Sequence, residues 1–558
     1  MERFDLGGHT RKITTASDDA QRLFNLGLNW CFGFNQEEGA TCFQRVLEFD
    51  PDCAMAHWGI AYAAGPFYNL PWCDLGEDEA IKMTRFCYDH AHMAKNLSAG
   101  CTTPEKALID ALLQRFQQPH PVSQAQHDQW DDDYADAMRR AYQTYPEDLD
   151  VTALFIEAIM TRTPWKLWNV KTNEPTQGAD TLEALDACER AMKLADDLGI
   201  PQHPAILHLH IHVTEMSPTP ERSMRAADLL AVACPNAGHM NHMPGHTYVL
   251  CGEYEKAKIA SELAIRADDM YLDYAGPYNF YTTARCHDLH LMMYTCMFLG
   301  QFTPAMAAAD KICETLTKDV LSMAGKPQMA HTMEGYFAMK MHVLVRFGRW
   351  QDIVDTPMPD DPALYCVSTA MHHYAKGVAH AALKGFDQAD EQRRLFHAAC
   401  VRIPENRKFF NNNALVTLGI GEKMLDGELE YHKGNYAIAY EHLRESVQRD
   451  DNLEYTEPWA WMHPPRHALA ALLMEQGHYT EAEDVYRTDL GLNDTLQRCA
   501  QHPRNVWALH GFVECLRKRG DTDELPEYEA LLAKALTKTD VAITSSCLCR
   551  TNVASCCS

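Results

Sequence analysis

A short unit recurs along this chain, and it constrains the fold more than any other feature. Each copy has a Gly-containing turn followed by an amphipathic helix, as in "HKGNYAIAYEHLRESVQRDD", where Ala439, Leu443 and Val447 recur at helical spacing. Similar copies are "CGEYEKAKIASELAIRADDMY", "LGQFTPAMAAADKICETL" and "EQGHYTEAEDVYRTDLGLN". No long alternating pattern of the kind typical of strands competes with them. The sequence therefore predicts an all-α solenoid of helical hairpins, curved or closed around a central pocket.

The copies are irregular, and segments such as "NVKTNEPTQGAD" and "LSMAGKPQMAH" indicate longer loops between hairpins. No low-complexity or Pro/Ser-rich linker interrupts the body of the chain. We therefore predict one helical repeat domain over residues 17–540, an N-terminal extension over residues 1–16 and a Cys-rich disordered tail over residues 541–558.

The charge balance restricts the partners of this chain. Against 50 Lys and Arg stand 77 Asp and Glu, which gives a net charge of −27 without a basic stripe. Nucleic acid and anionic membrane surfaces are therefore not expected as partners. The sequence shows neither a signal-peptide core nor an apolar run of membrane-spanning length. These features predict a soluble cytoplasmic protein.

The chain has 20 cysteines, and most stand singly within helical patterns, which is typical of reduced thiols in a core. The exception is the polar C-terminal segment with Cys547, Cys549, Cys556 and Cys557. These residues suit a soft metal or palmitate, although their spacing matches no defined zinc motif.

Seven histidines form three short clusters in the middle of the chain. They are His208 and His212, then His239, His242 and His246, then His287 and His290. In the first cluster His208, His212 and Glu215 fall within a stripe roughly 60° wide on a helix, whereas His210 points the other way. This spacing lets two imidazoles hold one metal ion, with Glu215 as a third ligand, a partner of the ligands or a proton acceptor.

The second and third clusters fall on later helices. We expect Pro244 in the first turn of a new helix, with His246 in that turn and His239 and His242 in the approach. His212 and His246 lie 34 residues apart, which is the length of the tetratricopeptide repeat. Stacked hairpins would bring the clusters together.

A transition-metal site is therefore predicted at His208, His212, His239, His242, His246, His287 and His290. Imidazole ligands favour copper or zinc, with copper the first expectation, and Glu215 keeps iron as a further option. The alternative is that these side chains are hydrogen-bonded core residues, as isolated buried histidines usually are.

A second patch, "EYTEPWAWMHPPRHALAALL", places Glu457, Trp461, His463 and Arg466 near a Pro-rich helix entry. Aromatic residues beside an Arg and a Glu can orient a small anionic or aromatic substrate. Alternatively, the same residues pin a loop to the solenoid.

The chain resembles a family of tetratricopeptide-repeat proteins with His-rich opening helices. The resemblance rests on "GLNWCFGFNQEEGATCFQRVLEFDPDCAMAHWGIAYAAGP", on "IHVTEMSPTPERSMRAADLL" with "AGHMNHMPGHTYVLCGEYEKA", and on "EPWAWMHPPRHALAALLMEQGHYTEAEDVYRTDL" with "NVWALHGFVECLRKRG". The family pattern runs His-x-x-x-His-x-x-Glu, Gly-His-x-x-His-Met-Pro-x-His and His-Asn-x-His, and it maps onto the three clusters and Glu215. Asp288 stands where the family has Asn, which leaves the ligand set open.

Two functions remain open from the sequence. The first is a metal-dependent enzyme, an oxidoreductase acting on a small molecule, with one or two ions at the histidines, Glu215 as the catalytic group and substrate entering past residues 457–466. The second is a non-catalytic scaffold whose groove binds a peptide or protein partner, with structural histidines.

Overall fold

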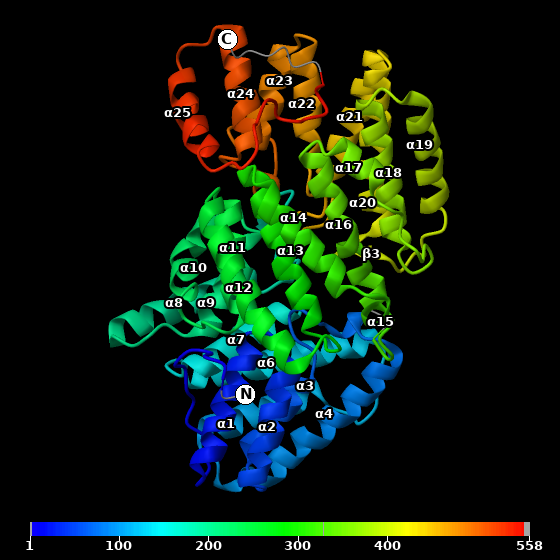
Figure 1. Cartoon of the computed structure of the whole chain (residues 1–558). Helices are drawn as coiled ribbons and strands as arrows, with labels where there is room; N and C mark the ends of the chain where they lie inside the picture. The colour runs from blue at the N-terminus through cyan, green and yellow to red at the C-terminus, as the bar shows by residue number, and fades with distance from the viewer. Residues whose placement is uncertain (1–2, 327–328, 552–558) are drawn as a thin grey trace. The chain divides into compact units, whose positions relative to one another are not determined.

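The structure is a computed structural model that describes residues 3–326 and 329–551 (Figure 1). Its regular structure is almost entirely α-helical, which confirms the predicted fold class. The chain groups into two compact units, where the sequence predicts a single repeat domain. We call them unit 1 (Met1–Thr247, Glu262–Arg285 and Ala324–Gln328) and unit 2 (Tyr248–Ser261, Cys286–Met323 and Met329–Ser558).

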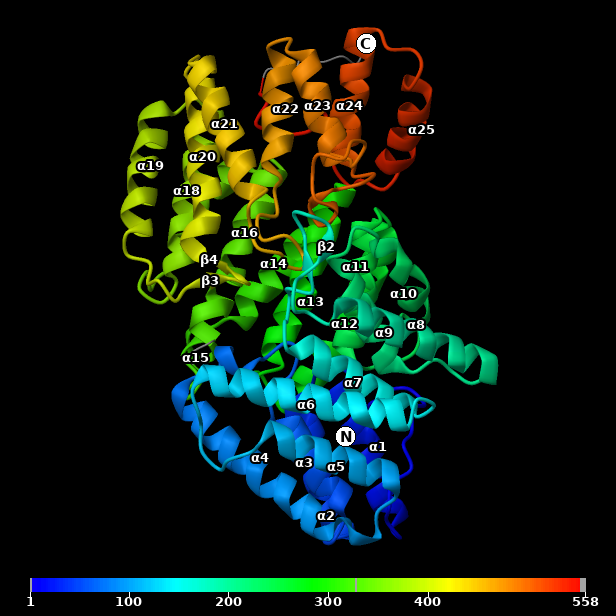
Figure 2. The same ribbon diagram turned by 180° about the vertical axis from the view of Figure 1, so that it is seen from behind.

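Unit 1 consists of antiparallel helices that pack on their neighbours in the chain, and Figure 2 shows α3 to α7 side by side. Its helices are α1 (Asp18–Phe32), α2 (Gln36–Phe49), α3 (Ala54–Ala64), α4 (Glu77–Leu97), α5 (Thr103–Arg115), α6 (Gln124–Thr144), α7 (Leu149–Thr161), α8 (Thr181–Leu198), α9 (Pro204–Glu215) and α10 (Met224–Leu230). Strands β1 (Trp168–Asn169) and β2 (Glu174–Pro175) pair antiparallel within the first predicted long loop. Three helices contribute residues to both units: α11 (Gly238–Leu250), α12 (Tyr254–Ala275) and α13 (Thr282–Leu299).

Unit 2 has the layered arrangement of tetratricopeptide-like hairpins. Its helices are α14 (Phe302–Thr315), α15 (Lys318–Leu321), α16 (Glu334–Arg346), α17 (Trp350–Asp355), α18 (Cys366–Ala382), α19 (Phe386–Cys400), α20 (Ala414–His432), α21 (Tyr436–Asp450), α22 (Pro465–Glu475), α23 (Tyr479–Asp489), α24 (Val506–Arg519) and α25 (Leu525–Leu536). The opening helices α16, α18 and α20 pack on one another in turn, and α19 and α21 each pack on their own partner. Strands β3 (Lys408–Phe409) and β4 (Asn412–Asn413) form a short antiparallel pair.

The first hairpin shows why the repeated unit folds as it does. The Ser17 side chain accepts a hydrogen bond from the Ala20 backbone N–H at the start of α1, and Asn35 caps α2 in the same way through Glu38. These caps satisfy N–H groups that have no partner inside a helix. The turn between α1 and α2 is only three residues long, so the two helices pack as antiparallel neighbours.

Close packing of α2 on α3 depends on a residue without a side chain. A Cβ atom at Gly59 would lie 2.6–2.8 Å from the ring of Phe43, which is fully buried. Real Cβ contacts essentially never come this close, so the aromatic ring occupies the space that Gly59 leaves open. The small residues of the repeat therefore act by admitting bulky neighbours.

One predicted helix start is wrong. Helix α11 begins at Gly238, and Pro244 lies inside it, where the sequence predicts Pro244 in the first turn. Proline lacks an N–H and cannot bond the carbonyl four residues earlier, so it is unfavourable in a helix interior. The helix continues through this position because α11 is buried along its whole length, and tertiary packing outweighs local propensity.

The C-terminal segment also differs from the prediction. Residues 543–549 pack into unit 2: Ser546 is 1% exposed, Cys547 2% and Cys549 0%. The predicted disordered tail is therefore wrong for this segment, because its small polar residues find hydrogen-bond partners in the helices. Cys556 and Cys557 lie outside the described residues.

The cysteines that the structure describes are free thiols, and most of them are buried, as the sequence predicts. Among residues 3–326 and 329–551, no helix combines the length and the apolar character needed to cross a bilayer.

We expect Gly59→Ala to destabilise the protein by roughly 1–2 kcal/mol, because overlap with the Phe43 ring outweighs the gain in helix propensity. The check is the urea midpoint followed by circular dichroism. Gly100→Ala is the matched control, since a Cβ there meets nothing within 4 Å, and it should change stability by less than about 0.5 kcal/mol. Equal midpoints for the two variants would contradict the packing argument.

Candidate metal centre

Helix α9 presents the first histidine cluster in the predicted way. His208, His212 and Glu215 are 0%, 0% and 1% exposed, and they lie on one face of the helix. His210 points elsewhere, and its Nε2 lies 3.9 Å from Oε1 of Glu189. Burial lowers the pKa of His210 to about 4. The spacing in the sequence therefore separated the site histidines of this helix from its other histidine.

Helix α11 supplies the second cluster. His239, His242 and His246 are spaced i, i+3 and i+7, which is the spacing of one helix face, and each is at most 2% exposed. A Cβ atom at Gly238 would overlap the Asp268 carboxylate, so only glycine allows the helix to start here. The Tyr281 hydroxyl accepts a hydrogen bond from the His239 backbone N–H. These contacts hold the first turn of α11 in place.

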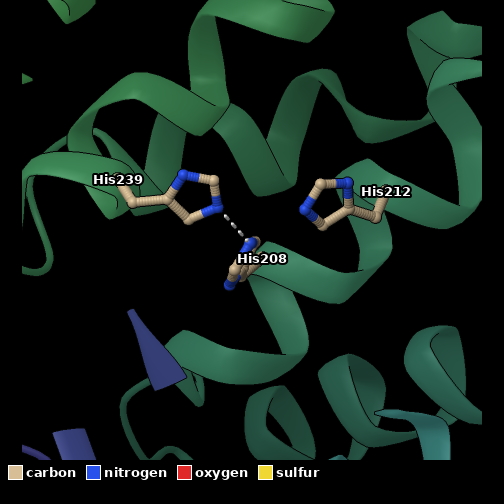
Figure 3. Close-up of side chains that lie close together, drawn as sticks. All are labelled: His208, His212 and His239. Atoms are coloured by element: carbon tan, nitrogen blue, oxygen red, sulfur yellow. Dashed lines mark hydrogen bonds between the residues drawn. The ribbon is translucent and has the colours of Figure 1, made fainter. Parts of the chain in front are cut away.

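The two helices bring three imidazoles together (Figure 3). The Nε2 atoms of His208 and His239 are 3.1 Å apart. One ring nitrogen from each of His208, His212 and His239 lies within 4.8 Å of the others. Three convergent imidazole nitrogens in a buried position form a ligand set that suits a transition metal.

The other two histidines of α11, His242 and His246, extend this group. The Nε2 atoms of His242 and His246 are 2.6 Å apart, and the His242 ring stacks on that of His239 with centroids 5.8 Å apart. The His246 ring lies 6.1 Å from that of His212. Five imidazoles of unit 1 therefore form a closed circuit, as the 34-residue spacing of His212 and His246 suggests.

A single carboxylate orients two of these rings. Glu215 accepts from Nδ1 of His212 through Oε1 at 2.8 Å and from Nδ1 of His246 through Oε2 at 2.6 Å. Because an ionised carboxylate only accepts, these bonds place the ring hydrogens on Nδ1 and leave the Nε2 lone pairs facing inward. The Phe32 backbone oxygen does the same for Nδ1 of His208 at 2.9 Å.

Phe34 covers the histidines and was not recognisable from the sequence. Its ring lies 4.4 Å from that of His208 and stacks on those of His212 and His239 at 5.9 and 5.2 Å. Its backbone has φ +57°, in the left-handed region that costs a non-glycine residue roughly 1–2 kcal/mol. Strain of this kind concentrates at functional sites, which supports a role for this turn beyond packing.

A small cavity adjoins His208. Its volume is about 10 Å³, close to what one water molecule needs, and its polar lining comes from His208, Tyr62 and Glu157. The Tyr62 hydroxyl donates to Oε2 of Glu157, and Oε1 of Glu157 has no hydrogen-bond partner among the described residues. Burial raises the pKa of Glu157, which favours the neutral acid. No pattern in the sequence pointed to this residue.

A separate cluster of polar residues packs against Phe32, whose carbonyl orients His208. His9 and His203 both direct Nε2 at Oδ1 of Asp150, at 2.9 and 3.2 Å, while Arg11 donates to Oδ2 at 3.0 Å. The Phe32 ring contacts both imidazoles, with centroids 5.7 Å from His9 and 5.1 Å from His203. The N-terminal segment is thereby tied to the residue whose carbonyl orients His208.

The third predicted cluster belongs to unit 2. His290 is fully buried on α13, and its ring stacks on Phe410 at 4.8 Å and meets Tyr336 edge-on at 5.4 Å. His287 is half-buried on the same helix. A ligand role for these two residues stays a prediction.

The predicted substrate patch lies in unit 2 and is mostly internal. Trp461 is 1% exposed and donates to the Met424 sulfur at 3.2 Å, and Arg466 is held by both carboxylate oxygens of Asp451. His463 is buried and Glu457 is half-buried. These contacts favour the interpretation in which the patch pins a loop, and substrate binding there stays a prediction.

Comparison with known proteins adds a likeness in fold. No family model matches the chain, and no curated protein matches it. Among solved structures, the human IFIT1 dimer with m7Gppp-AAAA is similar over 94% of this chain and 91% of that chain, at 10% identity and a TM-score of 0.32. Yeast Tom70 is similar over 94% and 93%, at 11% identity and a TM-score of 0.28. At such values the likeness carries no functional information, and the description of the hairpins rests on the helices of this chain.

Proposed function

We propose that this protein is a metal-dependent enzyme whose transition-metal ion binds to Nε2 of His208, His212 and His239. One ring nitrogen from each of these three buried histidines lies within 4.8 Å of the other two, which supports the proposal. His242 and His246 continue the same circuit of rings, so the site has ligands for one ion or two. Imidazole ligands favour copper or zinc ahead of iron.

The residues present fit such an ion. Each ligand ring must be neutral and must turn a lone pair toward the metal. The hydrogen bonds from His212 to Glu215 and from His208 to the Phe32 carbonyl select that tautomer before any metal binds. The Phe34 ring covers the imidazoles and shields them from water. The attraction between a metal ion and its ligands is stronger where water is excluded. The metal would act as a Lewis acid or a redox centre there.

Glu215 is better suited to orient imidazoles than to accept a proton from substrate. Both of its oxygens already accept from ring N–H groups, and it is 1% exposed. We therefore assign it a positioning role, and its sequence-based role as the catalytic group stays a prediction.

The cavity beside His208 supports catalysis over a purely structural metal. It offers room for a water-sized group next to a ligand of the proposed ion, and it is lined by the Glu157 carboxyl group, whose pKa is raised by burial. A water molecule or a single oxygen atom of a substrate fits this space. Oxidoreductase activity is the reaction class that copper would support.

The double variant His212→Ala/His246→Ala should bind less than about a tenth of the metal that the wild type holds, because it removes two imidazoles and both partners of Glu215. The measurement is metal content by plasma mass spectrometry after gel filtration, with circular dichroism to verify folding. His210→Ala, on the same helix but outside the circuit, should keep full stoichiometry. Stoichiometric metal in the folded double variant would exclude these ligands.

Glu215→Gln tests the positioning role. The amide keeps the size of the side chain but can accept through only one atom, so one imidazole loses its oriented tautomer. We expect metal affinity to fall about 10–100-fold, measured by competition with a chromophoric chelator. An unchanged affinity together with loss of turnover would instead support the general-base role of Glu215.

Azide distinguishes an enzyme from a scaffold. If the ion has an exchangeable position at the His208 cavity, azide added to the copper-loaded protein should produce a new ligand-to-metal absorption band. Glu157→Ala, which changes the lining of the cavity, should alter the azide affinity. A spectrum that does not respond to azide would favour a structural metal in a protein-binding scaffold.

A further inference from the structure

A second group of buried polar side chains lies in unit 2, independent of the histidine circuit. His342 and Arg346 are one turn apart on α16, and His463 and His467 are four residues apart at the start of α22; all four are at most 2% exposed. The Trp461 ring meets the His342 ring edge-on at 4.5 Å. The i, i+4 spacing puts His342 and Arg346 on one face of α16. His463 lies just before α22, and burial together with the neighbouring Arg346, His467 and His342 lowers its pKa.

Ser546 joins the two segments a second time. Its backbone oxygen accepts from Nη2 of Arg346 at 3.2 Å, and its hydroxyl donates to the His467 backbone oxygen at 3.0 Å. The contacts of Trp461 with His342, and of Ser546 with Arg346 and His467, therefore place the start of α22 beside α16.

Arg346 is a buried cation without a carboxylate partner among the described residues. Its guanidinium lies 3.9 Å from the centre of the Trp507 ring, and its Nη1 has no hydrogen-bond partner there. Burial lowers the pKa of Arg346 to about 9, so the side chain still carries its charge at neutral pH. Cys547, Asp489 and Cys549 act on this charge from a distance without bonding to it, so a bound anion that accepts from Nη1 would compensate the charge directly.

The neighbouring thiol does not remove this requirement. Burial raises the pKa of Cys547, whereas the Cys549 thiol and Arg346 lower it below the ordinary value. A Cys547 thiolate is thus the competing counter-charge for Arg346. A thiolate does not provide hydrogen-bond partners for the ring nitrogens of His463 and His467 that lack them.

His467 offers an acceptor in the same place. Its Nε2 lies 2.8 Å from Oδ2 of Asp489, and Oδ1 of Asp489 accepts from Nδ1 of His502 at 2.8 Å. Burial by itself raises the pKa of Asp489, but the two imidazoles lower it below the usual range, so it is ionised and can only accept. Nε2 of His467 therefore carries the hydrogen. Burial lowers the pKa of His467 to about 4, so the ring is neutral and its Nδ1 is a bare acceptor.

Neither Nδ1 of His467 nor either ring nitrogen of His463 has a hydrogen-bond partner among the described residues. A neutral imidazole has one donor and one acceptor nitrogen. The cluster thus provides donors from Arg346 and His463, and acceptors from His463 and His467. Leaving such buried groups unsatisfied is unfavourable, because each has lost its hydrogen bonds to water.

We propose that Arg346, His463 and His467 form a binding site for a small oxyanion that also carries an O–H group. The anionic oxygen accepts from Nη1 of Arg346, and the O–H donates to Nδ1 of His467. Hydrogen phosphate, phosphate monoesters and 2-hydroxycarboxylates share this chemistry. Sulfate and acetate at neutral pH have acceptors only, and they leave the His467 acceptor unsatisfied.

The test is overnight equilibrium dialysis of the full chain, freed of metal by a chelator, against inorganic phosphate, lactate, sulfate or acetate at pH 7.5 and constant ionic strength. Removing the metal excludes binding at the histidine circuit of unit 1. We expect phosphate or lactate to bind at one site per chain, and sulfate and acetate at least about tenfold more weakly, the loss typical of one unmade buried hydrogen bond. Which of the two O–H-bearing anions binds identifies the source of the ligand.

Variants separate the site from adventitious binding. Arg346→Lys, which loses the planar fork, and His467→Gln, which keeps a donor for Asp489 but lacks the acceptor, should each weaken binding at least about tenfold. Arg349→Lys and His478→Gln are matched controls at exposed positions and should bind as the wild type does. The proposal is overturned if neither phosphate nor lactate binds to the wild type, if sulfate binds equally well, or if folded Arg346→Lys and His467→Gln retain full affinity. The comparison of anions needs no variant, so it stands even where a variant fails to fold.

Discussion

The Glu215 carboxylate, shared between imidazoles of α9 and α11, is the interaction on which the candidate site depends. One oxygen holds Nδ1 of His212 and the other holds Nδ1 of His246. A buried carboxylate without such partners would be too costly to keep ionised, and these two histidines without a fixed acceptor would lack a defined tautomer. The carboxylate and the rings therefore stabilise one another, and they determine which nitrogens face the centre.

The same arrangement occurs three times among residues 3–326 and 329–551. Asp150 accepts from His9 and His203, Glu215 from His212 and His246, and Asp489 from His467 and His502. In each case the acidic residue is buried and its two histidine partners come from separate segments. Repeat proteins bury little surface between distant parts of the chain, because each hairpin contacts mainly its neighbours. Charge-assisted hydrogen bonds between imidazole and carboxylate add specific links between those segments.

The three arrangements differ in what they leave available. Around Asp150, the Nε2 atoms of His9 and His203 are used in the hydrogen bonds to the carboxylate, and Arg11 donates to its other oxygen. This group therefore anchors the N-terminal segment. Glu215 binds Nδ1 atoms and leaves Nε2 atoms facing inward, which suits a metal. Asp489 binds Nε2 of His467 and leaves Nδ1 as an acceptor beside a buried Arg, which suits an oxyanion that also carries an O–H group. The ring atom that the carboxylate selects thus decides the chemistry that remains.

Much of the fold and part of the site followed from the sequence alone. Helical periodicity and turn residues identified the hairpins, and the i, i+4, i+7 spacing identified His208, His212 and Glu215 as one face, because both depend only on the geometry of a helix. The start of α11 at Gly238, the packing of residues 543–549 and the positions of Phe34 and Glu157 did not follow from it. Each of these depends on contacts with segments far away in the chain, where burial overrides local preference and no spacing records the neighbour. Tertiary structure alone therefore decided which ring nitrogens converge.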